Sequence, residues 1–198
     1  MFKLRVVRDR RFQESSLALN PQDAKALGLG HRRQLVVAYG QRQEEVHFET
    51  RGDIPLGEGE LGHLAAEHLL FHPEVSYELR LVGERLILGP VIGLMMRHTE
   101  SQLLEEIDHT LPYLLNYPQV GGAAFIFAVD QIRPDQDAIE GYIYNPSPGA
   151  SPIKKGLFPF PAVWYRRVGF YDTAQYRRVR QSLGPRMVNG YYFTKWEF

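Results

Sequence analysis

The stretch Leu86-Ile87-Leu88-Gly89-Pro90-Val91-Ile92-Gly93-Leu94-Met95-Met96 marks the place where this sequence changes character. Short alternating segments with many charged and turn residues precede it, and a continuous apolar run, a capped amphipathic segment and a second apolar run follow it. Pro90 fixes its own φ angle, lacks an N–H group and disfavours a helical conformation at Gly89. We therefore predict that one strand ends here, that another begins, and that the chain divides into residues 1–88 and 89–198.

Composition limits the classes of protein to which the chain can belong. It has 198 residues, 44% of them apolar, which is enough for a substantial core in one large or two small domains. Basic and acidic residues number 23 each, so no net field favours nucleic acid or an anionic membrane as a partner. The absence of cysteine excludes disulfides and thiolate zinc sites and fits a reducing compartment.

The N-terminus and the apolar runs indicate a soluble, intracellular protein. Met1-Phe2-Lys3-Leu4-Arg5 lacks the apolar region of a signal peptide. The longest apolar run stops at Arg97, after about half of the ~20 residues that are needed to span a bilayer. We therefore expect a cytoplasmic protein without a membrane partner.

Residues 1–88 pass twice through the same predicted order of elements: strand, short strand, helix, strand. In the first pass these are 2–7, 17–19, 22–27 and 34–39, with Asn20 as the helix cap and Pro21 in the first turn. In the second they are 45–50, Ile54-Pro55-Leu56, 60–71 and the strands 75–82 and 86–88. Two such units would close on each other about a pseudo-twofold axis. We predict a small β-barrel of the double-psi kind.

The segment Gly57-Glu58-Gly59-Glu60-Leu61-Gly62 matches the G-x-G-x-x-G pattern of dinucleotide-binding loops. Pro55 separates it from the preceding strand, and the carboxylates of Glu58 and Glu60 would repel a pyrophosphate. We predict a loop before a helix, without nucleotide.

His68 and His72 lie four residues apart, with His63 nearby, as zinc ligands on one helix face do. The H-E-x-x-H pattern is missing, and Pro73 is expected to end the helix beside His72. Surface or capping histidines are favoured over a metal site, and the sequence leaves metal binding by these three residues open.

Residues 89–198 have the pattern of an α/β layer. The apolar run Val91–Met96 predicts a central strand, Thr99 and Gln102 form a capping box, and a leucine-rich stripe predicts one helix as far as Pro112. A second apolar run, Ala123–Val129, completes a βαβ unit. A hairpin over 139–145 and 153–158, a strand over 162–165 and a helix over 172–184 follow. Arg166 and Arg167 would then lie at the carboxyl end of a strand, where open α/β sheets bind ligands.

Four segments together resemble the YheC/YheD endospore coat-associated proteins of the ATP-grasp superfamily. They are Leu88–Leu94, Ile139-Glu140-Gly141-Tyr142, Phe158-Pro159-Phe160-Pro161 with Tyr165-Arg166-Arg167, and Asn189 with Lys195-Trp196-Glu197. The resemblance implies an N-terminal β module, a Rossmann-like layer that precedes the ATP-grasp domain, and then the ATP-grasp domain itself, beginning near Lys195. It also implies that ATP and Mg²⁺ bind only in that later portion, where a carboxylate is activated as an acyl phosphate.

The expected function is therefore that of a non-catalytic N-terminal region. We expect no cofactor in residues 1–198, because they contain no P-loop, no nucleophile elbow and no paired catalytic carboxylates. Arg167, Asn189 and Lys195 are the predicted residues of a substrate-binding or domain-interface site, with a C-terminal ATP-grasp domain and spore coat proteins as partners.

Two other functions compete with this expectation. One is a structural or interaction protein of the spore coat, which would use an aromatic surface. Its residues would be Trp164, Tyr171, Tyr191, Tyr192 and Trp196. The other is a nucleic-acid-binding barrel that uses N-terminal basic residues, although the acidic residues between them favour a solvated face. Those basic residues are Lys3, Arg5, Arg8, Arg10, Arg11, Arg32 and Arg33.

Overall fold

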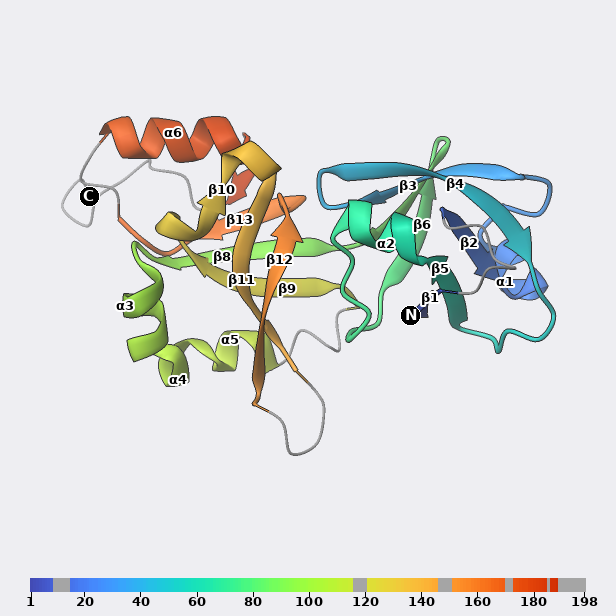
Figure 1. Cartoon of the computed structure of the whole chain (residues 1–198), viewed down its shortest axis with the longest axis horizontal. Coiled ribbons are helices and arrows are strands. Elements are labelled where there is room, and N and C mark those ends of the chain that lie inside the picture. The colour runs from blue at the N-terminus through green and yellow to red at the C-terminus, as the bar shows by residue number, and fades with distance from the viewer. Residues whose placement is uncertain (9–14, 116–120, 146–150, 170–172, 185, 189–198) are drawn as a thin grey trace.

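The computed structural model describes residues 1–8, 15–115, 121–145, 151–169, 173–184 and 186–188. It is a mixed α/β protein built on two seven-stranded sheets with few helices, and the first sheet curls into a half-barrel (Figure 1). The sheets lie beside each other along the long axis of the molecule. The chain passes from the first to the second at Gly89-Pro90, as the sequence predicts.

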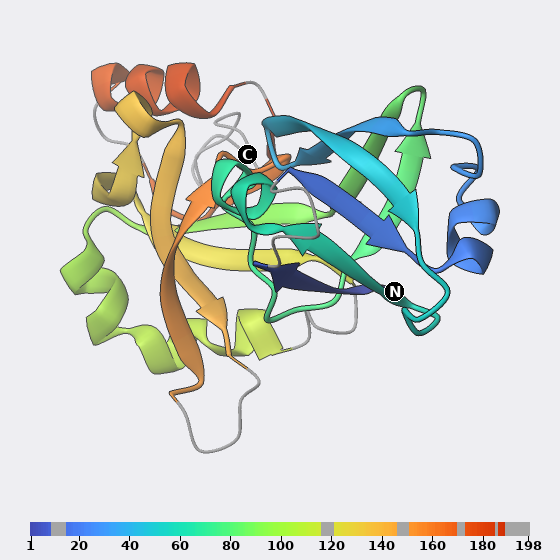
Figure 2. The ribbon, with the colours of Figure 1, turned by 45° about the vertical axis from the view of Figure 1, so that its right-hand side comes forward.

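The first sheet has the strand order β1-β5-β2-β4-β3-β7-β6. Its strands are β1 (Lys3–Val7), β2 (Ser16–Leu19), β3 (Gln34–Tyr39), β4 (Arg42–Thr50), β5 (Glu58–Gly62), β6 (Glu78–Val82) and β7 (Arg85–Gly89). The sheet curls so far that its two edges meet at one end (Figure 2). There Phe2 and Tyr77 exchange two backbone hydrogen bonds, of 2.6 and 2.7 Å.

Two short helices accompany this sheet, α1 (Pro21–Ala26) and α2 (His63–Leu69). The predicted cap of α1 is confirmed, because the Asn20 side chain accepts a hydrogen bond of 2.9 Å from the Gln22 N–H. Helix α2 ends at Leu70, whose φ of 53° is left-handed. Only the central part of the predicted helix 60–71 is therefore helical.

The prediction of a short strand at Ile54-Pro55-Leu56 is wrong, and so is the prediction of a loop at Gly57–Gly62. The strand is β5 (Glu58–Gly62), which pairs in parallel with β1 and antiparallel with β2. Gly59 allows this close packing, since a Cβ there would lie 2.6 Å from Leu19 Cδ2 and 2.7 Å from Leu4 Cδ2.

In the second sheet the strand order is β10-β11-β9-β8-β13-β14, with β12 added to β11. The strands are β8 (Val91–Arg97), β9 (Ala123–Ala128), β10 (Ile132–Arg133), β11 (Ala138–Tyr144), β12 (Ile153–Pro159), β13 (Val163–Arg166) and β14 (Met187–Val188). The row β9-β8-β13-β14 is parallel, whereas β10, β11 and β12 pair antiparallel. The central position of β8, the βαβ connection to β9 and the β11–β12 hairpin are confirmed.

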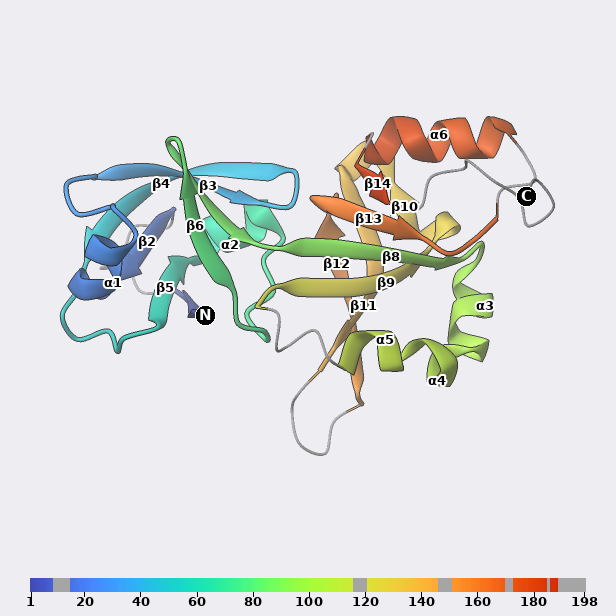
Figure 3. The same ribbon diagram turned by 180° about the vertical axis from the view of Figure 1, so that it is seen from behind.

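Helices cover both faces of the parallel row (Figure 3). They are α3 (Glu100–Glu105), α4 (Ile107–Thr110), α5 (Pro112–Leu115) and α6 (Thr173–Leu183), and the turns η2 (Val129–Gln131) and η3 (Pro134–Gln136) follow β9 and β10. The Thr99 capping box is confirmed. The prediction of one continuous helix is wrong, because Glu106 leaves the helical conformation. The predicted leucine stripe is only partly buried, since Leu104 and Leu115 are 43% and 45% exposed.

A single buried cluster contains apolar side chains from both sheets. Phe158 of β12 stacks on Phe125 of β9, with ring centroids 4.2 Å apart, and on His72 of the loop between α2 and β6, at 4.1 Å. The two sheets therefore share a packed seam. None of the helices in the described residues is both long and apolar enough to cross a bilayer.

Candidate functional site

In the parallel row, the direction in which the chain moves to the next strand reverses between β8 and β13. From β8 the chain passes through α3–α5 to β9, and from β13 it passes through α6 to β14, on the other side. The two connections lie on opposite faces, since Leu94 packs with Leu103 of α3 whereas Trp164 packs with Val179 of α6. Open α/β sheets bind ligands at the carboxyl ends of strands at such a reversal. Arg167 directly follows β13 at this place.

A groove of about 410 Å³ lies beside this reversal, on the face that carries α5. We call it the Arg167 groove. Its lining residues come from three neighbouring parallel strands, from α5 and from the end of β13: Ile92, Leu94, Tyr113, Val163, Tyr165, Arg167 and Val188. This volume lies in the usual range for small-molecule sites.

The backbone of Arg167 is fixed and its side chain is exposed. Its N–H donates a 2.9 Å hydrogen bond to the Met95 carbonyl, and its guanidinium lies 4.5 Å from the centroid of the Tyr113 ring. No carboxylate of the described residues pairs with this guanidinium. The other two predicted site residues, Asn189 and Lys195, lie outside the described part of the chain.

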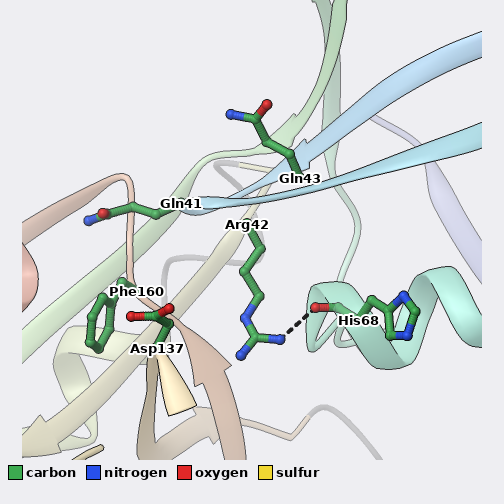
Figure 4. A pocket seen from close by; sticks show the side chains of 6 residues that line it. All are labelled: Gln41, Arg42, Gln43, His68, Asp137 and Phe160. Carbon is green, nitrogen blue, oxygen red and sulfur yellow. Dashed lines mark hydrogen bonds between the residues drawn. The ribbon is translucent and has the colours of Figure 1, made fainter. Parts of the chain in front are cut away.

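A second pocket, of about 510 Å³, lies at the seam between the sheets (Figure 4). We call it the seam pocket. It is lined by Gln41, Arg42, Gln43, His68, Asp137 and Phe160. Sequence reasoning missed this pocket, because the residues come from four segments and none of them carries a recognisable motif.

Arg42 joins the two sheets across the seam pocket. It projects from β4 toward α2 and donates hydrogen bonds of 2.6 Å to the carbonyls of His68 and Gln136 (Figure 4). One carbonyl is at the end of α2 and the other in η3 of the second half of the chain, so the guanidinium caps a helix and links the sheets. The adjacent Gln41 side chain donates bonds of 3.1 Å to the carbonyls of Pro161 and Leu183. Both terminal nitrogens of the Arg42 guanidinium and the Gln41 amide nitrogen therefore bond within the protein, whereas Arg42 Nε is buried without a partner among the described residues.

His72 takes part in the same seam and is not a surface histidine. It is 8% exposed, its Nε2 lies 3.0 Å from the Leu157 carbonyl, and its Nδ1 lies 3.6 Å from a carboxylate oxygen of Glu74. Lys154 of β12 pairs with the other oxygen of that carboxylate. His72 also lies beyond the end of α2, so it does not share a helix face with His68.

Two buried tyrosines complete the seam. The hydroxyls of Tyr39 and Tyr77 are 3.0 Å apart, and Tyr77 donates to the His72 carbonyl at 2.5 Å. Burial raises the pKa of both phenols far above the ordinary value, so both keep their protons at neutral pH. They act as fixed hydrogen-bonding groups inside the core.

Acid is expected to weaken the seam through Glu74. Its interaction with His72, assisted by Lys154, lowers the pKa of Glu74 from 4.5 to about 2. A lowered pKa in the folded state stabilises the protein above the unfolded pKa, so this contribution is complete above about pH 4.5 and is lost as the pH falls toward 2. Thermal unfolding measured from pH 5 to pH 2 should show a smaller fall of Tm in Glu74→Gln than in the wild type.

The matched control is Glu67→Gln, since the Glu67 side chain is 60% exposed and its ion pair among the described residues is with the exposed Arg8. That variant should follow the wild-type dependence of Tm on pH. Equal slopes for Glu74→Gln and the wild type would show that the Glu74 carboxylate does not stabilise the seam.

A third polar cluster ties α3 to the β11–β12 hairpin. The carboxylate of Glu100 accepts bonds from Tyr142 Oη at 2.5 Å and from Lys155 Nζ at 2.6 Å. Burial and the bond to Glu100 raise the pKa of Tyr142 to about 12. Asp130 accepts the Glu100 N–H and so anchors the start of α3. The charges in this cluster are mutually satisfied.

The structure also corrects the residues proposed for an aromatic surface. Trp164 is fully buried between the second sheet and α6, so it cannot contact a partner. The other four, Tyr171, Tyr191, Tyr192 and Trp196, lie outside the described residues.

The arrangement as a whole supports binding of a ligand or partner. The Arg167 groove offers one cation, two phenols and an apolar floor. Within the described residues no three histidine or acidic side chains are grouped so that they could hold a metal ion. Comparison of the chain with protein-family models, with curated proteins and with solved structures found no match.

Proposed function

We propose that this chain is the non-catalytic N-terminal portion of a YheC/YheD-like ATP-grasp protein, in which it supports substrate binding or the docking of a C-terminal ATP-grasp domain. Its two parts are a pseudo-twofold, double-psi-like barrel and a Rossmann-like layer that precedes the ATP-grasp domain. ATP and Mg²⁺ belong to that later domain, and the whole protein is a cytoplasmic ligase-like protein associated with the spore coat.

The strand pairing of the first sheet supports the barrel part of this proposal. The parallel pair β1–β5 matches the parallel pair β2–β4, and the antiparallel pair β2–β5 lies between them. The antiparallel β3–β4 pairing has its counterpart in the Phe2–Tyr77 bridge before β6. These matching pairings are the ones expected if a twofold axis relates the unit β1-β2-α1-β3 to the unit β4-β5-α2-β6.

The observation that carries the functional part is the Arg167 groove, which runs along the faces of β8 and β13 and has Arg167 at the carboxyl end of β13. An exposed cation that stacks on an aromatic ring, above an apolar floor, suits contact with a substrate or with another domain.

The two competing functions gain less support. Trp164 is unavailable to a coat partner, because it is buried. The basic residues near the N-terminus are partly neutralised, since Arg5 pairs with Glu58 and Glu60, and Arg8 pairs with Glu67. Ion pairing of this kind weakens a phosphate-binding track.

Calorimetry with Mg-ATP tests the proposal. Residues 1–198 should give no binding heat, whereas a chain extended past Phe198 through the following reading frame should give a saturable binding isotherm. Titration of both proteins with Mg²⁺ alone is the control. Tight nucleotide binding by residues 1–198, or a following sequence without an ATP-grasp domain, would overturn the proposal.

A further inference from the structure

The floor of the Arg167 groove is a continuous apolar surface. Parallel pairing aligns Ile92 with Val163 and Leu94 with Tyr165, so side chains of β8 and β13 lie side by side on one face. Val188 of β14 extends this surface by one strand. Val163 and Val188 are 40% and 50% exposed, so apolar surface that the fold does not cover faces solvent.

The groove has few polar groups, and each of them can donate a hydrogen bond. They are the guanidinium of Arg167 and the hydroxyls of Tyr113 and Tyr165, and none of the described lining residues is a carboxylate. Among these described lining residues a cationic ligand would find no counter-ion, and a sugar would find few hydrogen-bond acceptors. An anion would pair with the guanidinium.

The position of Arg167 is suited to such pairing. Because its guanidinium lies against the Tyr113 ring, that ring limits its rotation. The planar fork of N–H donors can then meet the two oxygens of a carboxylate or sulfonate. The hydrogen bond from the Arg167 N–H to Met95 holds the backbone at the end of the sheet.

We infer that the Arg167 groove binds a small organic anion with an aromatic or branched apolar body. The anionic group pairs with Arg167, and the body lies between Tyr113 and the floor made by β8, β13 and β14. This inference rests on the proposed function, because it takes the ligand-facing site of that proposal and names what the site binds.

Two fluorescent probes separate the anionic part of the ligand from the apolar part. 8-Anilinonaphthalene-1-sulfonate carries an aromatic body with a sulfonate, and N-phenyl-1-naphthylamine carries the same body without it. Titrated into residues 1–198, both should bind saturably. In Arg167→Gln the sulfonate probe should bind about tenfold more weakly, as expected for the loss of one charge-assisted interaction, and the neutral probe should be unchanged within twofold.

Two variants serve as controls for the position of the charge and for the floor. Arg178→Gln removes an exposed arginine of α6, on the opposite side of the sheet, and should leave both affinities unchanged. Val163→Glu places a carboxylate on the floor and should weaken the sulfonate probe and the neutral probe alike, at least tenfold. Near-UV circular dichroism and Tm show that each variant remains folded.

The inference is overturned if the sulfonate probe does not bind saturably, or if Arg167→Gln binds it as tightly as Arg178→Gln does. Neither probe resembles a nucleotide, and the test uses residues 1–198 alone. The result is therefore obtained separately from the Mg-ATP titration of the extended chain, so failure of the inference and failure of the proposed function can be told apart.

Discussion

Replacement of Phe158 by alanine is expected to lower the free energy of unfolding by about 4 kcal/mol. The Phe158 side chain is fully buried and stacks on both sides, on Phe125 with an interplanar angle of 6° and on His72 with one of 14°. Its removal would leave a cavity at the seam between the sheets. The loss therefore combines apolar transfer, ring stacking and the contact that joins the two halves of the chain.

Urea unfolding followed by circular dichroism measures this loss. Phe158→Leu keeps most of the volume and should cost less than about 1.5 kcal/mol. Val163→Ala, at a half-exposed position of β13, should cost less than about 1 kcal/mol. If Phe158→Ala were as stable as Val163→Ala, the seam would contribute little to the stability of the fold.

Replacement of Gly122 by alanine is expected to cost about 3 kcal/mol, although it adds only one methyl group. A Cβ at this position would lie 2.3 Å from the carbonyl oxygen of Pro90 and 2.7 Å from its Cδ. That same carbonyl accepts the N–H of Ala123 at 2.9 Å, where β8 and β9 begin to pair. The clash is with backbone at the joint between the sheets, so it cannot be relieved by rotating a side chain.

Gly30→Ala is the matched control, since a Cβ at Gly30 meets no atom within 4 Å. It should change the free energy of unfolding by no more than about 0.5 kcal/mol. Chemical denaturation of both variants under the same conditions gives the comparison. A stable Gly122→Ala protein would mean that the start of β9 can move away from Pro90 without loss.

The predictions that hold rest on local chemistry. The Asn20-Pro21 start of α1 and the Thr99 capping box need only neighbouring residues. The apolar runs that became β8 and β9 are buried on both faces, so their composition alone indicates central strands. The place of Arg167 directly after a strand is confirmed in the same way, whereas its role in binding stays a prediction.

The failures involve partners that lie far away in the sequence. The segment around Glu60 has too much charge and glycine for a typical strand, yet Glu60 is only 9% exposed in β5. Its carboxylate accepts bonds from Arg5 at 3.2 Å and from Arg51 at 2.6 Å, which neutralise it. The seam pocket could not be predicted for a similar reason, since Arg42 donates to the carbonyl of Gln136, which lies 94 residues away in the sequence.

The pairing of the first strand affects how the chain folds as it leaves the ribosome. Lys3 pairs with Glu58, and Phe2 pairs with Tyr77, so β1 is made long before its partners. At a synthesis rate of about 5–20 residues per second, β1 waits on the order of 4 to 15 s for the residues that cover it. Its buried Leu4 stays exposed to other nascent chains during that interval. A high density of nascent chains is therefore the condition in which this protein is most prone to aggregate.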